Sequence, residues 1–310
     1  MAAPSAPVLG CTIQLTASSD LAASVQAAPA GSHICLASGT YRLSATVVVK
    51  PGDTFSGPAS ARPVIDASAT DNGFDTHNAA NVVYENLVIE GAQSPGKTCP
   101  TCGRGIWGGD NMEVFNVEAM NNAVNGIGGG QNSPHPWLIV GSQFVGNGSQ
   151  WAAGFASGGI KSGASYTIFN STASNNIGQG IWCDVGCNGG IWKVEGDTVT
   201  GNTGGGIRYE ISDVGAVISG NLVNDNNTSN RPGLGGIQVA SSGNAMVVDN
   251  TATNNGWAQI IFGGGGRRTL NAAGGIGIAT SENNVAQNNI VSGVGGIRGC
   301  SSPGVSCSGT

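Results

Sequence analysis

The sequence predicts an all-β protein, a right-handed parallel β-helix with a short N-terminal capping helix. A Gly-Ile pair recurs along the chain, and short strand-forming runs that end in Asn lie between the pairs. A unit of a few strands that repeats in this way is typical of a solenoid, in which each coil stacks on the preceding one. The pairs begin at Gly105, Gly126, Gly159, Gly180, Gly206, Gly236, Gly275 and Gly296.

The amino-acid composition agrees with this fold class. The chain contains 53 Gly residues, only 10% of its residues are charged, and Asn clusters follow the runs 166–170, 217–221 and 247–250. Asn and Gly suit tight turns because they tolerate left-handed backbone angles. Asn side chains that occupy the same position in stacked coils can also hydrogen-bond to one another.

The N-terminal region is predicted to close one end of the solenoid. Residues 20–28 have helical character, with Leu21 and Val25 at apolar spacing, and a strand-like run follows at 45–49. We expect a single domain over residues 1–310 with a cap over about 1–40. Long intervals between Gly-Ile pairs predict loop insertions at about 128–158 and 240–274.

The charge distribution argues against two classes of partner. The formal net charge is -6 with only 12 Lys and Arg residues, whereas a nucleic-acid partner requires clustered basic side chains. The longest apolar runs are far shorter than a membrane span. We therefore expect neither nucleic acid nor a membrane as a partner.

The eight cysteines indicate an oxidising compartment. An even number at short spacings favours disulfides, and we expect four pairs: Cys11–Cys35, Cys99–Cys102, Cys183–Cys187 and Cys300–Cys307. A zinc site is the alternative, but only Cys99 and Cys102 have the spacing that it needs. Disulfides would make this a secreted, extracellular protein.

Side chains that point outward can be identified from the position of each Gly-Ile pair. The Ile side chain points into the core, so the next residue and the residue two further on point outward. The first outward position is occupied by Trp107, Gly128, Lys161, Trp182, Arg208, Gln238, Gly277 and Arg298. The second is occupied by Gly109, Gly130, Gly163, Asp184, Glu210, Ala240, Ala279 and Cys300.

Two carboxylates on adjacent coils suggest glycoside hydrolysis. Stacked coils lie ~4.8 Å apart, so Asp184 and Glu210 should lie side by side, and their repulsion should raise one pKa. Hydrolysis of a glycosidic bond requires such an acid and base. The candidate catalytic residues are Asp184, Glu210, Lys161 and Arg208, and the candidate substrate-binding residues are Trp182, Gln238, Trp107 and His135. The alternative is a solvated ladder of ion pairs that contributes little.

Two segments resemble known β-helix proteins. The entry at 27–43, AAPAGSHICLASGTYRL, resembles the first coil of the pectate-lyase-like superfamily. The run Gly-Ile-Trp-Cys-Asp at 180–184, followed by Gly-Ile-Arg-Tyr-Glu-Ile-Ser at 206–212, is similar to bacterial β-helix repeat proteins that have no settled reaction. The resemblance implies the fold and a carbohydrate polymer as substrate. The polygalacturonase motifs NTD, GHG and RIK are absent, and no clear match to the calcium-binding carboxylates of pectate lyases is found.

Three functions remain open at this level. The leading one is an extracellular hydrolase that uses Asp184 and Glu210 on a polysaccharide. A lyase acting on uronic acids would instead use Lys161 or Arg208 as the base, with the two carboxylates holding a calcium ion. The third is a non-catalytic glycan-binding or structural β-helix. In each case the groove should centre on Trp182 and Arg208, between walls that carry His135, Trp137, Trp151 and Trp257.

Overall fold

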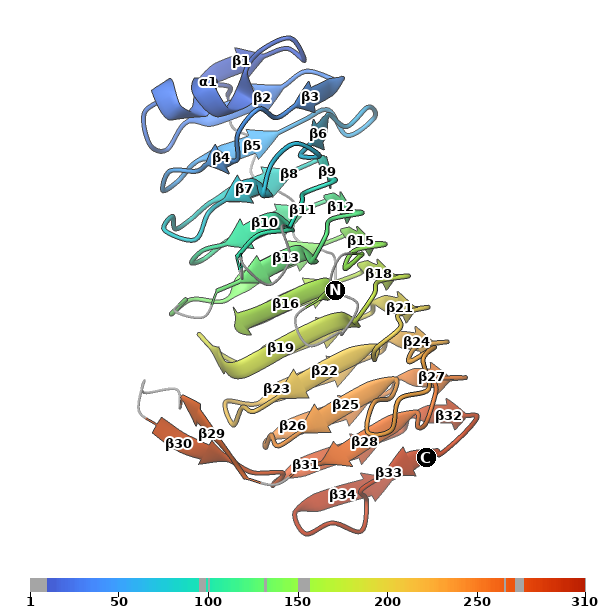
Figure 1. The fold of residues 1–310 in the computed structure, drawn as a ribbon. Helices are drawn as coiled ribbons and strands as arrows, with labels where there is room; N and C mark the ends of the chain where they lie inside the picture. The colour runs from blue at the N-terminus through green and yellow to red at the C-terminus, as the bar shows by residue number, and fades with distance from the viewer. Residues whose placement is uncertain are drawn as a thin grey trace.

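The computed structural model describes residues 10–94, 99, 101–130, 133–149, 157–264, 266–270 and 276–309. These residues wind into a right-handed parallel β-helix, which confirms the predicted fold class (Figure 1). Each typical coil contributes one strand to each of three parallel sheets. In the described part of the chain, no helix is both long and apolar enough to cross a membrane.

The sheet that carries the Gly-Ile pairs is called the ladder sheet below. Its strands pair in parallel and in chain order along the axis. They are β4 (Val47–Val48), β7 (Asn72–Asp75), β10 (Arg104–Gly108), β13 (Asn125–Gly129), β16 (Gly158–Ala164), β19 (Gln179–Asn188), β22 (Ile207–Glu210), β25 (Ile237–Ala240), β28 (Ile260–Gly263) and β33 (Ile297–Arg298).

The other two sheets complete the coil. The first contains β1 (Ile13–Leu15), β2 (His33–Leu36), β5 (Thr54–Ser56), β8 (Val83–Glu85), β11 (Glu113–Phe115), β14 (Trp137–Val140), β17 (Tyr166–Phe169), β20 (Trp192–Glu195), β23 (Ala216–Ser219), β26 (Ala245–Val248), β31 (Asn284–Gln287) and β34 (Val305–Ser308). The second contains β3 (Thr40–Arg42), β6 (Val64–Asp66), β9 (Val88–Glu90), β12 (Glu118–Met120), β15 (Gln143–Val145), β18 (Thr172–Ser174), β21 (Thr198–Thr200), β24 (Leu222–Asn224), β27 (Thr251–Thr253) and β32 (Ile290–Ser292).

The N-terminal cap forms as predicted. Helix α1 (Leu21–Ala27) begins after Asp20, whose carboxylate accepts a hydrogen bond of 3.0 Å from the backbone N–H of Ala23. Leu21 and Val25 are buried, and α1 lies across the N-terminal end of the coils (Figure 1). The helix thereby covers apolar side chains of the first coils that no further coil would cover.

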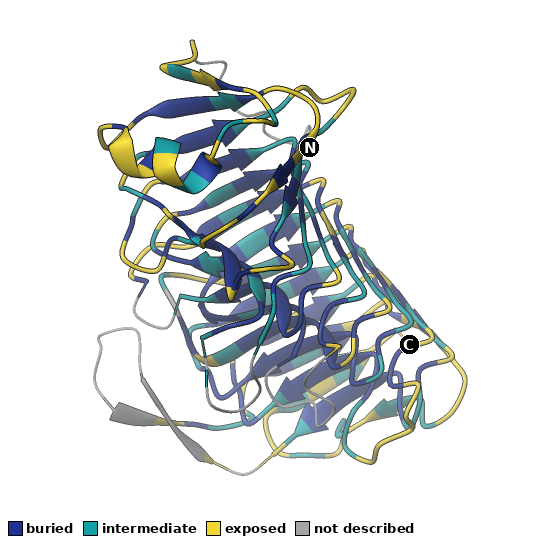
Figure 2. Ribbon diagram, turned by 45° about the horizontal axis from the view of Figure 1, so that its top comes forward, coloured by how far each residue is buried: buried dark blue, intermediate teal, exposed yellow. Residues whose placement is uncertain are grey.

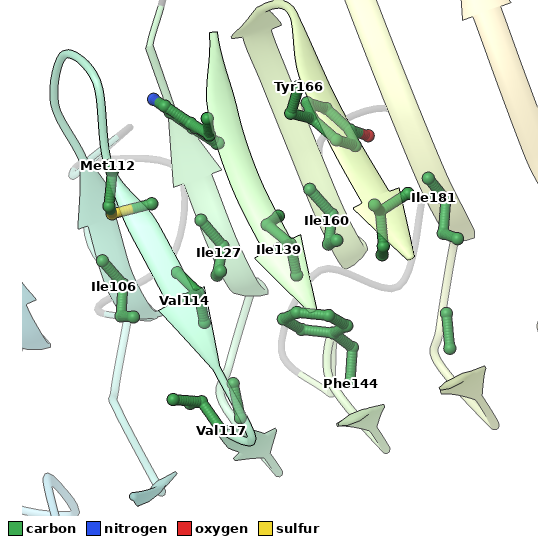
Figure 3. Close-up of a cluster of buried hydrophobic side chains, with 14 of the residues drawn as sticks. Ile106, Met112, Val114, Val117, Ile127, Ile139, Phe144, Ile160, Tyr166 and Ile181 are labelled. Atoms are coloured by element: carbon green, nitrogen blue, oxygen red, sulfur yellow. The ribbon is translucent and has the colours of Figure 1, made fainter. Parts of the chain in front are cut away.

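Isoleucine columns fill the interior. The Ile residues of the Gly-Ile pairs from Ile106 to Ile237 are completely buried and stack rung on rung in parallel register. Figure 3 shows Ile106, Ile127 and Ile160 in such a row, with Val114 and Ile139 beside them. Ile297, in the last coil, is only partly buried. Burial is concentrated in the strands, whereas most exposed residues lie in turns and in α1 (Figure 2).

Buried amide side chains form columns at the corners of the coils. In one column each Asn donates from Nδ2 to Oδ1 of the Asn in the next coil, at 2.7–3.0 Å. Each Oδ1 also accepts the backbone N–H of the preceding Asn, so the amide column satisfies buried backbone groups at the corner turns. This column contains Asn122, Asn147, Asn176, Asn202, Asn226 and Asn255.

One Gly-Ile pair was assigned to the wrong element. Ile276 does not belong to the ladder sheet but to β30 (Ile276–Ala279), which pairs antiparallel with β29 (Arg267–Leu270) in a hairpin that projects from the coils (Figure 1). Its expected rung is taken by Ile260, which pairs with Ile237 on one side and Ile297 on the other. The insertion therefore follows β28, instead of occupying the whole of 240–274. A dipeptide alone does not distinguish a rung from a hairpin strand.

The tryptophans that were expected in the walls of the groove also differ from the prediction. Trp137 lies in the core, 1% exposed, and donates from Nε1 to the carbonyl of Gly109 at 2.6 Å. Trp257 precedes β28, with the Arg298 guanidinium 4.2 Å from its ring centroid. Trp151 lies outside the described residues, as does part of the predicted insertion at 128–158.

All four expected disulfides are present. Cys11–Cys35 and Cys300–Cys307 join residues at the two ends of the described chain, and Cys99–Cys102 and Cys183–Cys187 close short loops. Cys183–Cys187 follows the ladder position of Trp182 and encloses Asp184. The zinc alternative is therefore not supported by these cysteines.

Candidate active site

The outer face of the ladder sheet brings the predicted site residues into one strip. Trp182 pairs with Lys161 on one side and with Arg208 on the other, and Asp184 pairs with Glu210. The first outward positions, in order along the axis, are Asp75, Trp107, Gly128, Lys161, Trp182, Arg208, Gln238, Ile261 and Arg298. Ile261 stands where Gly277 was expected, because β28 supplies that rung.

A cleft of about 700 Å³ opens on the N-terminal half of this strip. Its described lining includes the cations Arg104 and Lys161 and the side chains of Trp107, His77 and Asp184, but not those of Trp182, Arg208, Glu210 or Gln238. The hollow is therefore centred several rungs nearer the N-terminus than the predicted groove.

Two glycines on this strip leave room for neighbouring side chains. A Cβ atom at Gly128 would lie 2.7 Å from Nε of Arg104, and one at Gly130 would lie 2.5 Å from the Trp137 ring. Any larger residue at either position would displace those side chains. The arginine can therefore extend across the rung between Trp107 and Lys161.

Lys161 is held by two interactions at the cleft edge. Its Nζ atom lies 3.0 Å from Oδ2 of Asp184 and 4.2 Å from the ring centroid of Trp182. The side chains of Lys161 and Asp184 are 25% and 18% exposed, so both can reach a ligand.

Trp182 does not present a free ring to a sugar. It is only 3% exposed, and the guanidinium of Arg208 lies 5.0 Å from its ring centroid while Lys161 approaches from the other neighbouring rung. Cations over an indole ring are attracted by its electron-rich face. The expected stacking of a pyranose on Trp182 would require these cations to move, and the outward position of Trp182 does not make it accessible.

Arg208, Glu210 and Gln238 form a tight buried group beyond the cleft. Nη2 of Arg208 donates to Oε1 of Glu210 at 2.5 Å, and both side chains are about nine-tenths buried. Gln238 donates from Nε2 to the carbonyl of Gly233 at 2.6 Å. Three residues that we expected to touch substrate are therefore engaged with the protein itself.

The two carboxylates do not form a calcium site in this arrangement. Asp184 is paired with Lys161 and Glu210 with Arg208, so each anionic ligand already has a cation. Among the described residues, the only cluster with metal-ligand geometry is Asp71 with Cys99 and Cys102, and that cysteine pair is a disulfide. The donor set at Asp184 and Glu210 does not fit calcium.

Arg104 provides a positive charge in the cleft. Its Nε and Nη1 atoms are buried, and desolvation lowers the pKa of the guanidinium to about 10, although the charge of Asp75 opposes this shift. Even so, the guanidinium stays charged at neutral pH. A buried guanidinium in a cleft suits a carboxylate ligand, whose charge would stabilise it.

Asp75 and His77 form a pair that the sequence pattern did not reveal. Nδ1 of His77 lies 2.5 Å from Oδ1 of Asp75, and the imidazole stacks on Trp107 with centroids 3.9 Å apart and planes 11° apart. His77 lies two residues beyond the end of β7, so the alternation of side chains along the ladder strands does not place it. The rung of β7 reads Gly73-Phe74-Asp75, so aligning Phe74 with Ile106 would have revealed Asp75 beside Trp107.

A second histidine pair lies at the edge of the cleft. Nδ1 of His135 is 2.8 Å from Oδ2 of Asp110, and Ser133 donates to Oδ1 of the same carboxylate at 2.8 Å. These contacts help to hold the pKa of Asp110 below its usual value, even though burial opposes them. Asp110 and Ser133 line the cleft, but the 65% exposed His135 side chain, expected to bind substrate, does not.

Comparisons with known proteins give structural neighbours alone. No family model matches the sequence, and no curated protein matches it. An alginate lyase from Paenibacillus sp. str. FPU-7 has a TM-score of 0.63 and 17% identity, covering 95% of this chain and 99% of that one. Pectate lyase Pel9A has a TM-score of 0.55 and 12% identity, covering 97% and 78%. At these identities the likeness establishes the parallel β-helix fold alone.

Proposed function

We propose that this chain is an extracellular polysaccharide lyase that cleaves a uronic-acid-containing polymer by β-elimination. The observation that carries the proposal is the cleft, which gathers Arg104, Lys161 and the Asp75–His77 pair on one face. Shared fold with an alginate lyase and a pectate lyase supports it as analogy. The four disulfides support an oxidising compartment.

Elimination requires the kind of charge that the cleft supplies. A base removes the C5 proton, the electron pair forms the C4=C5 double bond, and the C4–O4 bond breaks as O4 takes up a proton. Negative charge develops on the uronate carboxylate as C5 loses its proton, so fixed cations beside it lower the barrier. Arg104 and Lys161 are the cations that line the cleft.

Hydrolysis fits the same geometry less well. A glycosidase needs one protonated and one ionised carboxyl group flanking the scissile bond. Asp184 is bound to Lys161, and Glu210 is buried against Arg208 outside the cleft lining. The residue pair on which the hydrolase interpretation depended is thus divided between two ion pairs.

A substrate panel tests the proposal. Purified protein is incubated with polymannuronate, polyguluronate, polygalacturonate and a neutral glucan, while ultraviolet absorbance and reducing ends are followed together. At least one uronan should yield both signals in equal amounts, because elimination leaves an unsaturated uronide. Reducing ends without absorbance would identify a hydrolase, and binding without any product would identify a glycan-binding protein.

Two lysines, one in the cleft and one in a different sheet, provide matched variants. Lys161→Gln should lower kcat/KM for uronan elimination at least about 10-fold, because a cation that binds a uronate carboxylate in the cleft is lost. Lys193→Gln changes a partly exposed lysine on β20, in a different sheet, and should leave turnover unchanged. Equal effects of the two substitutions would contradict a specific role for the cleft.

A further inference from the structure

We infer that His77 is the general base of this cleft and that Asp75 positions it. The inference rests on the eliminative function proposed above and assigns the proton transfer to a named atom, Nε2 of His77. It is independent of Lys161, which belongs to a rung three coils further along the axis.

Asp75 determines which imidazole nitrogen carries the proton. Its Oδ1 atom lies 2.5 Å from Nδ1 of His77 and also accepts the backbone N–H of His77 at 3.2 Å. A carboxylate at this distance requires a proton on Nδ1, so Nε2 keeps its lone pair in the neutral ring. This is the arrangement that a histidine base requires.

Trp107 and Asn78 fix the orientation of the ring. The imidazole lies flat against the Trp107 indole, with the centroids 3.9 Å apart. Nδ2 of Asn78 lies 2.6 Å from Nε2 of His77 and donates to its lone pair. Asn78 is exposed, and His77 and Asn78 both line the cleft. A substrate can therefore displace the Asn78 amide and take its place at Nε2 of His77.

The surrounding charges suit a uronate bound at His77. Arg104 belongs to the next rung, and its guanidinium carbon lies 5.7 Å from the Trp107 centroid. Lys161 lies three rungs from Asp75, about 14 Å along the axis at the usual strand spacing, and its ammonium group extends toward Trp182 on the next rung. Arg104 is therefore the cation nearer to His77 along the strip, while Lys161 would meet a different sugar of the same chain.

The proton balance of the step is complete. Nε2 of His77 takes the C5 proton, and the C–H electron pair becomes the C4=C5 double bond. The C4–O4 bond breaks, and O4 takes a proton from solvent. His77 then returns its proton to solvent, so the enzyme is regenerated and no water is consumed overall.

The test compares turnover, binding and chemical rescue. His77→Ala should lower kcat on the cleaved uronan at least about 100-fold while the Kd for an oligomer of that uronan changes less than about threefold, because a base acts in the transition state. Added imidazole should restore part of the lost kcat. As the control, imidazole should not accelerate His33→Gln, in which the altered histidine lies on β2 of another sheet.

Asp75→Asn tests the positioning role separately. In wild-type protein, nitrogen-15 NMR should show His77 protonated at Nδ1, and this tautomer should be lost in Asp75→Asn together with most of kcat. Elimination that survives in His77→Ala, or a wild-type ring protonated at Nε2, would overturn the inference and leave the proposed function standing. A wild-type protein that eliminates no uronan would overturn both.

Discussion

Asp197 stands in a buried column between Ser171 on one side and the asparagines Asn221 and Asn250 on the other. Its Oδ1 accepts the backbone N–H of Ser171 at 2.6 Å, and its own N–H donates to Oδ1 of Asn221. The equivalent Asn221 uses Nδ2 to donate to the carbonyl of Val194. Asp197 has no such donor when ionised, and its buried Oδ2 has no hydrogen-bond partner among the described residues. Burial accordingly raises the pKa of Asp197 to about 8.

This raised pKa makes stability depend on pH in a defined direction. The pKa of Asp197 in the folded protein is above the unfolded value of 3.8. The contribution of this residue to stability is therefore fully present below about pH 4 and is lost as the pH rises to about 8. Asp197→Asn restores a donor and removes the charge. It should stabilise the fold by about 1–3 kcal/mol at pH 8 and by much less at pH 4. Urea unfolding at both pH values measures this, and an unchanged pH dependence in the variant would contradict it.

Long side chains limit how well the site residues can be predicted from the sequence. Strand alternation correctly placed Trp182 facing outward, but the long side chains of Lys161 and Arg208 cover its ring. The alternation of side chains along a strand does not predict such contacts, because they depend on the rotamers of side chains in the neighbouring strands. His77 was missed for a related reason: it follows its strand, and its approach to Trp107 is set by the turn that Asp75 stabilises.

The amide column is the element that holds successive corners in register. Asn176 accepts from both nitrogens of Asn147 and donates to the carbonyl of Phe144 and to Asn202. Asn176→Ala should therefore lower the free energy of unfolding by about 3 kcal/mol, because buried partners lose their hydrogen bonds.

The neighbouring residue provides the control for the column. Asn175 is exposed and has a φ of 56°, which glycine adopts without strain. Asn175→Gly should change the unfolding free energy by less than about 1 kcal/mol. If denaturant unfolding shows the same loss for both variants, the column does not contribute the stability assigned to it.

The Gly-Ile repeat predicts most of the strands of the β-helix correctly, but it is wrong for a few individual strands. The capping helix and seven of the Gly-Ile rungs follow the prediction. The rungs at Phe74 and Ile260 lack the Gly-Ile pair, because Phe74 replaces Ile in the first and Gln259 replaces Gly in the second. Ile276 belongs to a hairpin strand instead, and only tertiary pairing distinguishes the two cases.

The ends of the molecule depend on their disulfides. Cys11–Cys35 spans 24 residues and ties β1 to β2 at the open end. Cys11→Ser should accelerate amide exchange in β1 by about 100-fold, corresponding to ~3 kcal/mol of lost loop-closure entropy. Strands β16 to β22, several coils away, should keep their protection, because each coil contacts mainly its neighbours. Uniform loss of protection along the chain would show instead that the coils unfold as one unit.

Over the whole molecule, the strip suits a polymer that lies along the solenoid axis. Arg104 and Lys161 come from strands two coils apart, about 10 Å at the usual spacing. One pyranose of an extended 1,4-linked chain advances the polymer by about one coil, so alternate uronates can face these two cations. A chain running across the axis would meet only one of them.

The most direct test of the account is a digestion in water enriched in oxygen-18. A uronan oligomer that the protein cleaves is incubated with it, and the new ends are examined by mass spectrometry. Elimination predicts a product pair that contains an unsaturated uronide and has no heavy oxygen at the cleaved bond. Heavy oxygen in the newly formed end, with no unsaturated partner, would establish hydrolysis and contradict the account.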